Sequence, residues 1–324
     1  MLKEICSQED VKIYGCENGL LLKEFIASTP ETRRICNDPV IAGVQYTDKL
    51  CSACEKILKA YDFGLKESST VVVKILRGGL NFGLRKALAN AYSWNNHTTC
   101  FLSAQRARND ADPESWHITE NAYRKLYFPN ETSFVIGDVV ATGTSLQYAL
   151  FELIREAKEA GTDLKRIVFF TYGGPQAATI LAQADAKCRE LFPGYQDTFL
   201  IYLEGCFSVP DPSSPLSIRL TGTDLVKRDS LMAPEFIESQ YEKSSYPLER
   251  CIIYDAGSRA FWVREYAGDV ISYWKQVLEI AERGTTFGEY LKERMDILDE
   301  KRFEKTDLIA LAKEQIGKMR KFLQ

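Results

Sequence analysis

Short runs of apolar residues alternate with amphipathic segments through the middle of the chain. The first run is TVVVKIL at 70–76, and further runs follow at 99–104, 133–138, 166–172 and 198–204. Continuous apolar runs of this length, separated by helices, are typical of parallel strands that are buried on both faces. The pattern therefore predicts an α/β fold with an open, mainly parallel, doubly wound sheet and flanking helices.

The segment after Gly143 gives the clearest helical pattern. Gly161 is placed to end this helix, and Thr144 with Gln147 fits a capping box at its start. We expect two further helices, at about 80–91 and 175–191. The apolar residues that recur at helical spacing after Gly143 are Leu146, Ala149, Leu150, Leu153, Ile154 and Ala157.

The two ends of the chain lack this alternation. The first seventy residues carry helical signals, most clearly at 46–61, and no strong strand is expected before Thr70. We expect a first domain at 1–234, with its core at 70–228 and an N-terminal helical segment, and a C-terminal extension at 235–324. The extension is expected to be mostly helical, of α+β character, with CIIYD at 251–255, a short strand near 260–264, and helices near 268–282, 287–298 and 306–322.

Composition excludes several classes of function. Of the 324 residues, 41 are Lys or Arg and 45 are Asp or Glu, so the net charge is -4 and a dedicated nucleic-acid binder is disfavoured. His97 and His117 are the only histidines, which leaves little material for a His-centred triad or a multi-His metal site. Any chemistry must come from other residues.

The sequence also lacks targeting signals and a disulfide framework. The charged start and the lack of any apolar run of roughly 18 residues predict a cytoplasmic protein without membrane contact. Nine scattered cysteines are expected to be reduced thiols. Cys51 and Cys54 form one CxxC, but their segment has a mid-helix pattern, so structural thiols are favoured over a metal or redox site.

The run SFVIGDVVATGTSLQYAL carries the sharpest chemical signal. An apolar strand ends at Asp138, and a loop of small residues then opens a helix. Backbone N–H groups and the positive end of the helix dipole at such a loop suit a phosphate, and the carboxylate suits sugar hydroxyls or a cation. A capped helix without a ligand is the alternative, but the order of these features favours a phosphate site at Ala141, Thr142, Gly143, Thr144 and Ser145.

A second glycine-containing segment, VVVKILRGGLNFGLRKAL, also follows an apolar strand. Gly78 and Gly79 let the backbone approach a ligand closely, and Arg77 offers a fork for phosphate oxygens. A P-loop is excluded because Leu84 and Arg85 stand where Lys followed by Ser or Thr is required. Taken alone, the two glycines also fit a tight turn between a strand and a helix.

Between the strands at 99 and 133 lies a long, polar segment. A loop of this length in a compact domain is usually a functional lid or is disordered. Arg106 and Arg108 lie at its start, where they either contact a ligand or form part of a solvated surface.

These segments together resemble the type I phosphoribosyltransferases. The strand, acid and loop at 133–145 resemble the family's phosphoribosyl-diphosphate motif, and ILRGGL is similar to the ILRAGL of its uracil members. The family's pair of acids appears here as Gly137 and Asp138, so one carboxylate is missing. Uracil members also keep a single acid, but they keep the first of the pair. The resemblance covers about 70–228 and fades at both ends.

The resemblance implies a reaction and roles for the site residues. Ribose 5-phosphate would pass from phosphoribosyl diphosphate to a nitrogen acceptor, with release of pyrophosphate. Asp138 would hold the ribose hydroxyls, the loop from Ala141 would bind the 5-phosphate, and Arg77 with Arg106 or Arg108 would stabilise the leaving group. Mg²⁺ would be held mainly by the substrate rather than by direct protein ligands.

The resemblance says less about the acceptor. Segments that read the base would lie at Tyr172 and Gly173, and at Gly222 and Asp224. Ala141 stands where purine-salvage members carry an acid, which disfavours hypoxanthine or guanine. The similarity to uracil members implies a pyrimidine as the acceptor.

Two other functions stay open at this point. The chain could bind nucleotide as a sensing or regulatory protein without turnover, which the missing acid supports. It could also be a structural or interaction protein in which the C-terminal extension acts and the site is relict. For the transferase we expect a homodimer whose partners are the small molecules phosphoribosyl diphosphate and a nitrogen acceptor, with no nucleic acid.

Overall fold

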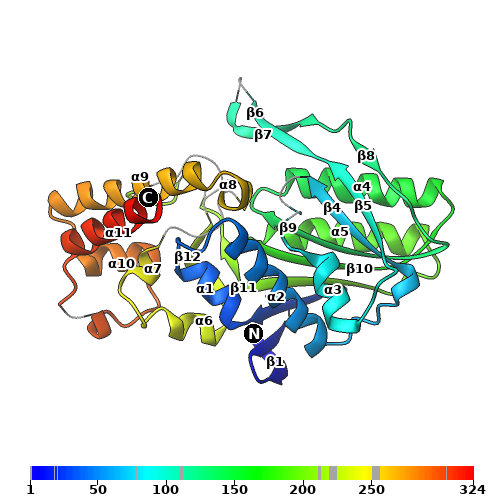
Figure 1. Cartoon of the computed structure of the whole chain (residues 1–324), viewed down its shortest axis with the longest axis horizontal. Coiled ribbons are helices and arrows are strands. Elements are labelled where there is room, and N and C mark those ends of the chain that lie inside the picture. The colour runs from blue at the N-terminus through cyan, green and yellow to red at the C-terminus, as the bar shows by residue number, and fades with distance from the viewer. Residues whose placement is uncertain are drawn as a thin grey trace.

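A ten-stranded sheet runs through the molecule, with helices on both of its faces (Figure 1). The computed structural model describes residues 2–17, 19, 21–76, 79, 81–109, 112–210, 213–218, 225–249, 256–303 and 305–324, but not the side chains of 105–117, 120 and 256. The sheet contains β1 (Leu2–Gln8), β2 (Val11–Cys16), β3 (Lys23–Ser28), β4 (Thr70–Leu76), β5 (Thr98–Ser103), β8 (Arg124–Lys125), β9 (Glu131–Val140), β10 (Asp163–Gly173), β11 (Asp197–Ser208) and β12 (Val226–Met232).

Six of these strands form a parallel core in the order β3-β11-β10-β9-β4-β5. From β4 the chain moves first to β5 on one side and then to β9 on the other, so the winding reverses between β4 and β9. In open α/β sheets, ligands bind outside the carboxyl ends of the strands at such a reversal. The prediction of an open, mainly parallel α/β sheet is confirmed.

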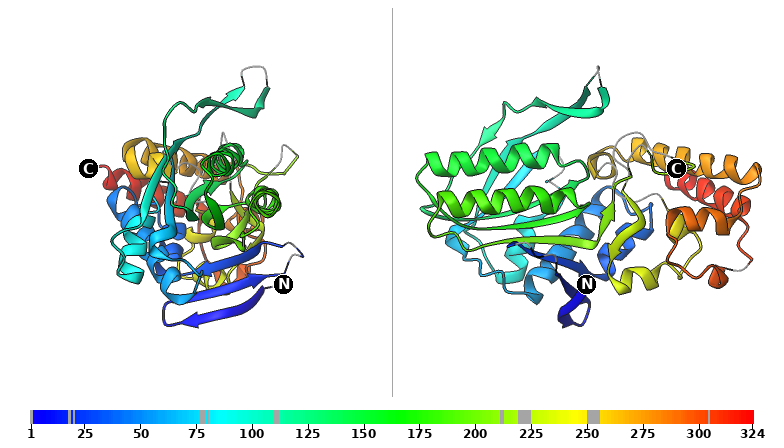
Figure 2. Two further views of the ribbon diagram at one scale, coloured as in Figure 1. Left: turned by 90° about the vertical axis from the view of Figure 1, so that its right-hand side faces the viewer. Right: turned by 180° about the vertical axis from the view of Figure 1, so that it is seen from behind.

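Helices on opposite faces follow from this reversal, because parallel crossovers are right-handed. In Figure 2, α4 (Thr144–Glu159) and α5 (Gln176–Leu191) lie side by side on one face. The other face carries α2 (Val44–Ala60) and α3 (Leu84–Tyr92). The apolar stripe predicted for α4 is buried as expected. Its capping box is not formed, because Gly143 rather than Thr144 occupies the N-cap position.

The N-terminal segment differs from the prediction. The first 28 residues contain three strands, and helices begin only with α1 (Pro30–Asn37) and α2. β3 extends the parallel core beside β11, while β1 and β2 add an antiparallel ribbon at the sheet edge. The expectation that no strand precedes Thr70 was therefore wrong. β1 is mostly solvent-exposed, so its sequence carries little of the alternation that marks a strand.

The C-terminal residues form a group of helices beyond the end of the sheet at which β11 and β12 pair (Figure 1). The three main helices were predicted, but the strand expected near 260–264 is helical, and CIIYD at 251–255 lies outside the described residues. The division at 234/235 stays a prediction. The helices are α6 (Pro234–Ser239), α7 (Ser245–Leu248), α8 (Ala256–Phe261), α9 (Val263–Glu282), α10 (Phe287–Arg294) and α11 (Leu308–Phe322), and short 3-10 turns lie at Glu67–Ser69 and Glu300–Phe303.

A buried arginine joins this group of helices to α1 and α2. Arg259 of α8 is 1% exposed and donates to the carbonyl oxygens of Ile35, Asp38 and Ile41. Its guanidinium also lies 5.1 Å from the ring centre of Tyr46. These contacts satisfy carbonyl groups at the end of α1 that its own helix cannot pair. The C-terminal helices thus share one hydrophobic core with the sheet.

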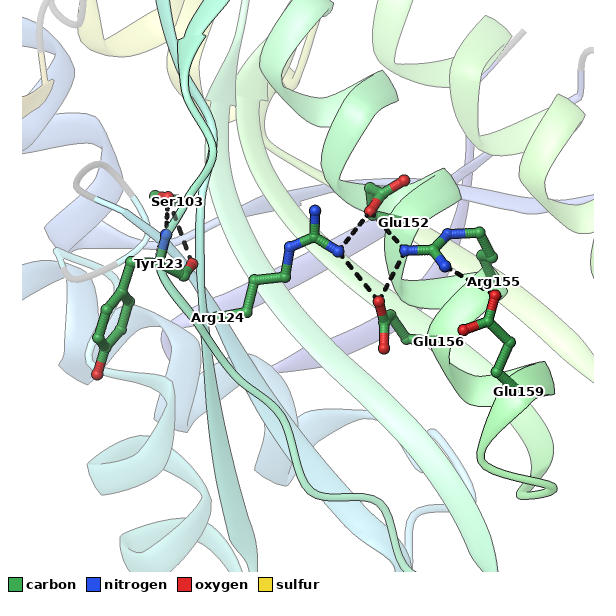
Figure 3. A network of polar contacts seen from close by, with 7 residues as sticks. All are labelled: Ser103, Tyr123, Arg124, Glu152, Arg155, Glu156 and Glu159. Carbon is green, nitrogen blue, oxygen red and sulfur yellow. Dashed lines mark hydrogen bonds and ion pairs between the residues drawn. The ribbon is translucent and has the colours of Figure 1, made fainter.

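The long polar segment contains a two-stranded hairpin, β6 (Gln105–Asn109) and β7 (Asp112–Glu120), which projects from the body in Figures 1 and 2. Its base is fixed by polar contacts (Figure 3). The N–H of Ser103 donates to the carbonyl of Tyr123 over 2.9 Å, and the N–H of Tyr123 donates to Ser103 Oγ over 3.0 Å.

A charge network on α4 holds the return strand of this segment. Arg124 of β8 pairs with Glu152 at 2.9 Å and Glu156 at 3.0 Å, and Arg155 bridges the same two carboxylates (Figure 3). These ion pairs anchor the return strand to the helix that follows β9, and the Ser103–Tyr123 hydrogen bonds join it to the strand that leads into the hairpin.

The described cysteines are all free thiols. Cys51 and Cys54 lie within α2, as the mid-helix pattern predicted, and burial raises the pKa of both. High pKa values disfavour the thiolate that metal binding and redox chemistry need. Of the helices that the structure describes, none has the length and apolar character needed to cross a lipid bilayer.

Candidate functional site

The loop between β9 and α4 places the first-turn N–H groups of α4, which no side chain caps, at the carboxyl edge of the sheet. Gly143, at the N-cap of α4, has a φ of 79°, in the left-handed region, and has no side chain to accept from the first-turn N–H groups. A Cβ at Gly143 would also overlap the terminal methyl group of Ile180, which would have to shift. Thr142 and Thr144 present hydroxyl groups 3.5 Å apart beside these donors. This loop can therefore bind an anion.

Asp138 lies two residues before the end of β9, at the reversal of winding beside β4. It is 9% exposed, and its Oδ1 accepts a 2.9 Å hydrogen bond from the backbone N–H of Val139. Buried carboxylates are rare unless they are hydrogen-bonded or functional. Asp138 and the anion-binding loop thus share one end of one strand.

The glycine segment after β4 meets β9 at the same place. Arg77 and Gly78 lie outside the described residues, but Gly79 is buried. A Cβ on Gly79 would lie 3.0 Å from the carbonyl oxygen of Gly137, so the two backbones are in close contact. The structure therefore brings together the two glycine-bearing segments that the sequence singled out.

The position of the missing acid is closed by an aromatic ring. A Cβ on Gly137 would lie 2.5 Å from Cγ and 2.7 Å from Cδ1 of Phe82, which is fully buried. No side chain fits at Gly137 unless Phe82 moves, because contacts this short are repulsive. The departure from an acidic pair is thus built into the packing between β9 and the segment that leads to α3.

A pocket of about 460 Å³ opens next to the anion-binding loop. It extends from that loop across the carboxyl ends of β10 and β11 to β12. Its size is in the range of small-molecule sites. Its lining residues are Ala141, Thr142, Pro175, Gln176, Cys206, Phe207, Ser208, Val209 and Asp229.

The remaining predicted residues either do not line this pocket or lie outside the described residues. Tyr172 is fully buried and its hydroxyl donates to the carbonyl of Thr32 over 3.4 Å, so its side chain extends toward α1 and does not line the pocket. Gly173 packs against β9, since a Cβ there would lie 2.7 Å from the carbonyl oxygen of Val140. Gly222 and Asp224 lie outside the described residues, as do the side chains of Arg106 and Arg108.

The sequence reasoning missed Glu204, a buried carboxyl on β11. Glu204 has a φ of 68° at a point where β11 shifts register against β10. Its Oε2 accepts from Ser28 Oγ over 2.7 Å, and its Oε1 accepts from the N–H of Thr29 over 3.1 Å and from the hydroxyl of Thr32. A lone Glu in an apolar run, FLIYLEG, was the available signal. Glu204 fixes the end of β11, beside the pocket, to the start of α1.

We predict that two buried carboxyl groups contribute stability that is lost as the pH rises from about 4.5 to about 7. Burial raises the pKa of Glu204 from 4.5 to about 7, against opposing hydrogen bonds from Thr32 and Ser28, and burial does the same to Glu249. At these two groups the folded state binds protons more tightly than the unfolded state, so their contribution to stability is largest below pH 4.5 and is lost through pH 7. Each group contributes at most about 3 kcal/mol.

Denaturant unfolding at pH 5.5 and pH 8 measures this effect. Glu204→Gln should reduce the difference between the two pH values, whereas Glu190→Gln, at an exposed position on α5, should not. An unchanged difference in Glu204→Gln would show that this carboxyl is ionised in the folded protein throughout the range.

Comparisons with known proteins add limited information. The chain matches no family model and no curated protein sequence. Two of the similar solved structures are phosphoribosyltransferases. A hypoxanthine-guanine phosphoribosyltransferase from Bacillus anthracis is 14% identical over 40% of this chain and 70% of its own, with a TM-score of 0.27. An adenine phosphoribosyl transferase from Trypanosoma brucei, solved with AMP, pyrophosphate and ribose-5-phosphate, is 11% identical over 56% of this chain and 82% of its own, with a TM-score of 0.34. Both likenesses cover only part of this chain.

Proposed function

We propose that this chain is a phosphoribosyltransferase of the type I class. One observation carries the proposal: Asp138, the uncapped start of α4 and the glycine segment after β4 meet at the reversal of the sheet, beside a pocket for a small molecule. Phosphoribosyl diphosphate carries a 5-phosphate at one end of its ribose and a pyrophosphate at the other. A site for it needs two anion-binding segments, with a polar side chain between them for the ribose hydroxyls. The meeting of these segments offers that arrangement.

In the proposed reaction, a nitrogen of the acceptor attacks the anomeric carbon of phosphoribosyl diphosphate. The C–N bond forms, the bond from that carbon to the pyrophosphate oxygen breaks, and pyrophosphate leaves with the electron pair. The acceptor nitrogen, if it carried a proton, releases that proton to solvent. Positive charge develops on the sugar and negative charge on the leaving oxygens, so fixed charges and dipoles lower the barrier.

The residues of this chain take distinct roles in this proposal. The backbone N–H groups from Thr142 to Ser145 bind the 5-phosphate at the positive end of α4. Asp138 accepts hydrogen bonds from the ribose hydroxyls and stabilises the developing positive charge. Gly79 and its neighbours Arg77 and Gly78 receive the pyrophosphate, and Arg106 or Arg108 approaches it from the anchored hairpin.

Mg²⁺ fits this site as an ion brought by the substrate. Near the anion-binding loop, Asp138 is the carboxylate that β9 provides, and the pyrophosphate oxygens would supply further hard ligands of the kind that Mg²⁺ prefers. When bound, the ion would neutralise the leaving group.

A sensing protein that binds nucleotide without turnover is the second candidate. The observation in its favour is the closure of Gly137 by Phe82, which removes one carboxylate from the site. Such a protein would keep the phosphate loop and the pocket but would stabilise the transition state less.

Release of pyrophosphate distinguishes these candidates. We expect purified protein with phosphoribosyl diphosphate, Mg²⁺ and a panel of nitrogen bases to release pyrophosphate with at least one base. Binding of phosphoribosyl diphosphate without release would favour the sensor. If the protein neither binds phosphoribosyl diphosphate nor releases pyrophosphate, the proposed function is contradicted and an interaction protein is favoured.

A further inference from the structure

The pocket beside the anion-binding loop carries one acidic side chain. Among its described lining residues, Thr142, Gln176 and Ser208 are polar and uncharged, Asp229 is acidic, and no Lys or Arg is present. The end of the pocket away from the phosphate loop therefore favours groups that donate hydrogen bonds. Among the lining residues that the structure describes, none is a cation that could pair with an acidic ligand.

A bulge in β12 brings Asp229 to this pocket. Cys206 pairs with Leu231 and Ser208 pairs with Val226, so Phe207 alone stands opposite residues 227–230. Asp229 has a φ of 57°, in the left-handed region that Asp tolerates better than most residues. Bulges near ligand sites often redirect a side chain in this way.

Hydrogen bonds and burial hold this bulge in place. The N–H of Ser208 donates to Ser230 Oγ over 2.7 Å, and that hydroxyl donates to the carbonyl of Val226 over 2.6 Å. The neighbouring Lys227 is 3% exposed and donates to Gln240 Oε1 over 3.0 Å, on the side of the C-terminal helices. Lys227 thus anchors the bulge to the C-terminal extension, while Asp229 lines the pocket.

Asp229 is available to a ligand on this side. Its side chain is 75% exposed, and Arg228, which is not part of the pocket lining, lies 3.5 Å from its Oδ2. From the anion-binding loop the pocket is lined by Ala141 and Thr142, neither of which has a carboxylate. A carboxylate therefore reaches the pocket from β12 rather than from the loop after β9.

We infer that Asp229 selects the acceptor of the proposed reaction, and that this acceptor donates an N–H hydrogen bond to Asp229 and carries no carboxylate. The inference rests on the proposed function, because it takes the 5-phosphate to lie in the loop at Ala141–Ser145. A carboxylated base would place a second negative charge near Asp229, and the described lining residues include no cation to offset the repulsion between the two, which lowers affinity. An uncharged or cationic base meets no such penalty.

Binding of matched nucleotides tests this inference without any need for turnover. Two pairs differ mainly by a carboxylate on the base: uridine and orotidine 5′-monophosphate, and nicotinamide and nicotinate mononucleotide. We expect titration calorimetry to show that the wild-type protein binds the non-carboxylated member of each pair at least about tenfold more tightly, which is about 1.4 kcal/mol. Two different rings separate the effect of charge from that of ring shape.

Variants at Asp229 provide the control. Asp229→Asn keeps a residue that tolerates the left-handed region and should reduce the preference in both pairs to less than about threefold. Asp229→Lys should reverse the preference. Ribose 5-phosphate, which has no base, should bind equally to the wild type and to Asp229→Asn.

The outcomes separate the two proposals. If the wild-type protein does not bind ribose 5-phosphate, the proposed function itself is contradicted. Normal ribose 5-phosphate binding together with equal or tighter binding of the carboxylated nucleotides, or a preference unchanged in Asp229→Asn, would overturn the role of Asp229 alone.

Discussion

Replacement of Asp138 by Asn is expected to lower the rate of pyrophosphate release by about 10²–10³-fold, the loss typical of a removed electrostatic contact to a transition state. Asn keeps the oxygen that accepts from the N–H of Val139, so packing at the end of β9 is preserved. What changes is the negative charge beside the ribose. Rates of pyrophosphate release at saturating substrate, with thermal unfolding midpoints for both proteins, measure the effect.

Glu131→Gln is the matched control for this variant. Glu131 lies at the opposite end of β9 and its side chain is 55% exposed, so the same loss of charge occurs on the same strand away from the site. We expect wild-type activity there. Equal rates in Asp138→Asn and wild type would contradict the assignment of Asp138, and a lower unfolding midpoint only in Asp138→Asn would show that its role is structural.

Replacement of Gly137 by Asp, which would restore an acidic pair, is expected to destabilise the protein and abolish activity. The new Cβ would lie within 2.8 Å of three atoms of Phe82, and the carboxylate would be buried against that ring. Overpacking costs about 1–3 kcal/mol, and burial of an unpaired charge adds several more. Chemical denaturation and pyrophosphate release measure the two effects.

A double-mutant cycle tests the physical cause. Gly137→Ala and Phe82→Ala should each destabilise the protein, one by overpacking and the other by leaving a cavity. The double variant should be more stable than the sum of the two losses by about 1–3 kcal/mol, because the methyl group enters the space that the ring leaves. Additive losses, or a Gly137→Asp variant as stable as wild type, would show that Phe82 does not close this position.

Much of the sheet could be predicted because its signals are local. The parallel strands from β4 to β11 are buried on both faces, so each reads as a continuous apolar run. The strands β1 to β3 could not be read in this way. β1 is mostly exposed and β3 begins with the polar residues Lys23 and Glu24, so pairing along the sheet rather than a sequence pattern determines them.

The candidate site could be predicted only where it is contiguous in sequence. Asp138 and the loop to Ser145 follow one another along the chain, and their residue types alone indicate an anion site. The packing of Phe82 against Gly137 and the presence of Asp229 and Ala141 in one pocket depend on how distant segments pack. The contacts of Glu204 could not be predicted for the same reason, because its hydrogen-bond partners lie on β3 and at the start of α1.

Titration of phosphoribosyl diphosphate with Mg²⁺ into the wild type and into Thr144→Glu tests the central claim most directly. Thr144 is the first residue of α4, whose first turn has no acid, so Glu there should stabilise the helix while repelling a phosphate. The account predicts one molecule bound per wild-type chain, and at least about tenfold weaker binding to Thr144→Glu with an unchanged or higher unfolding midpoint. Equal affinity of the two proteins, or no binding to the wild type, would contradict it.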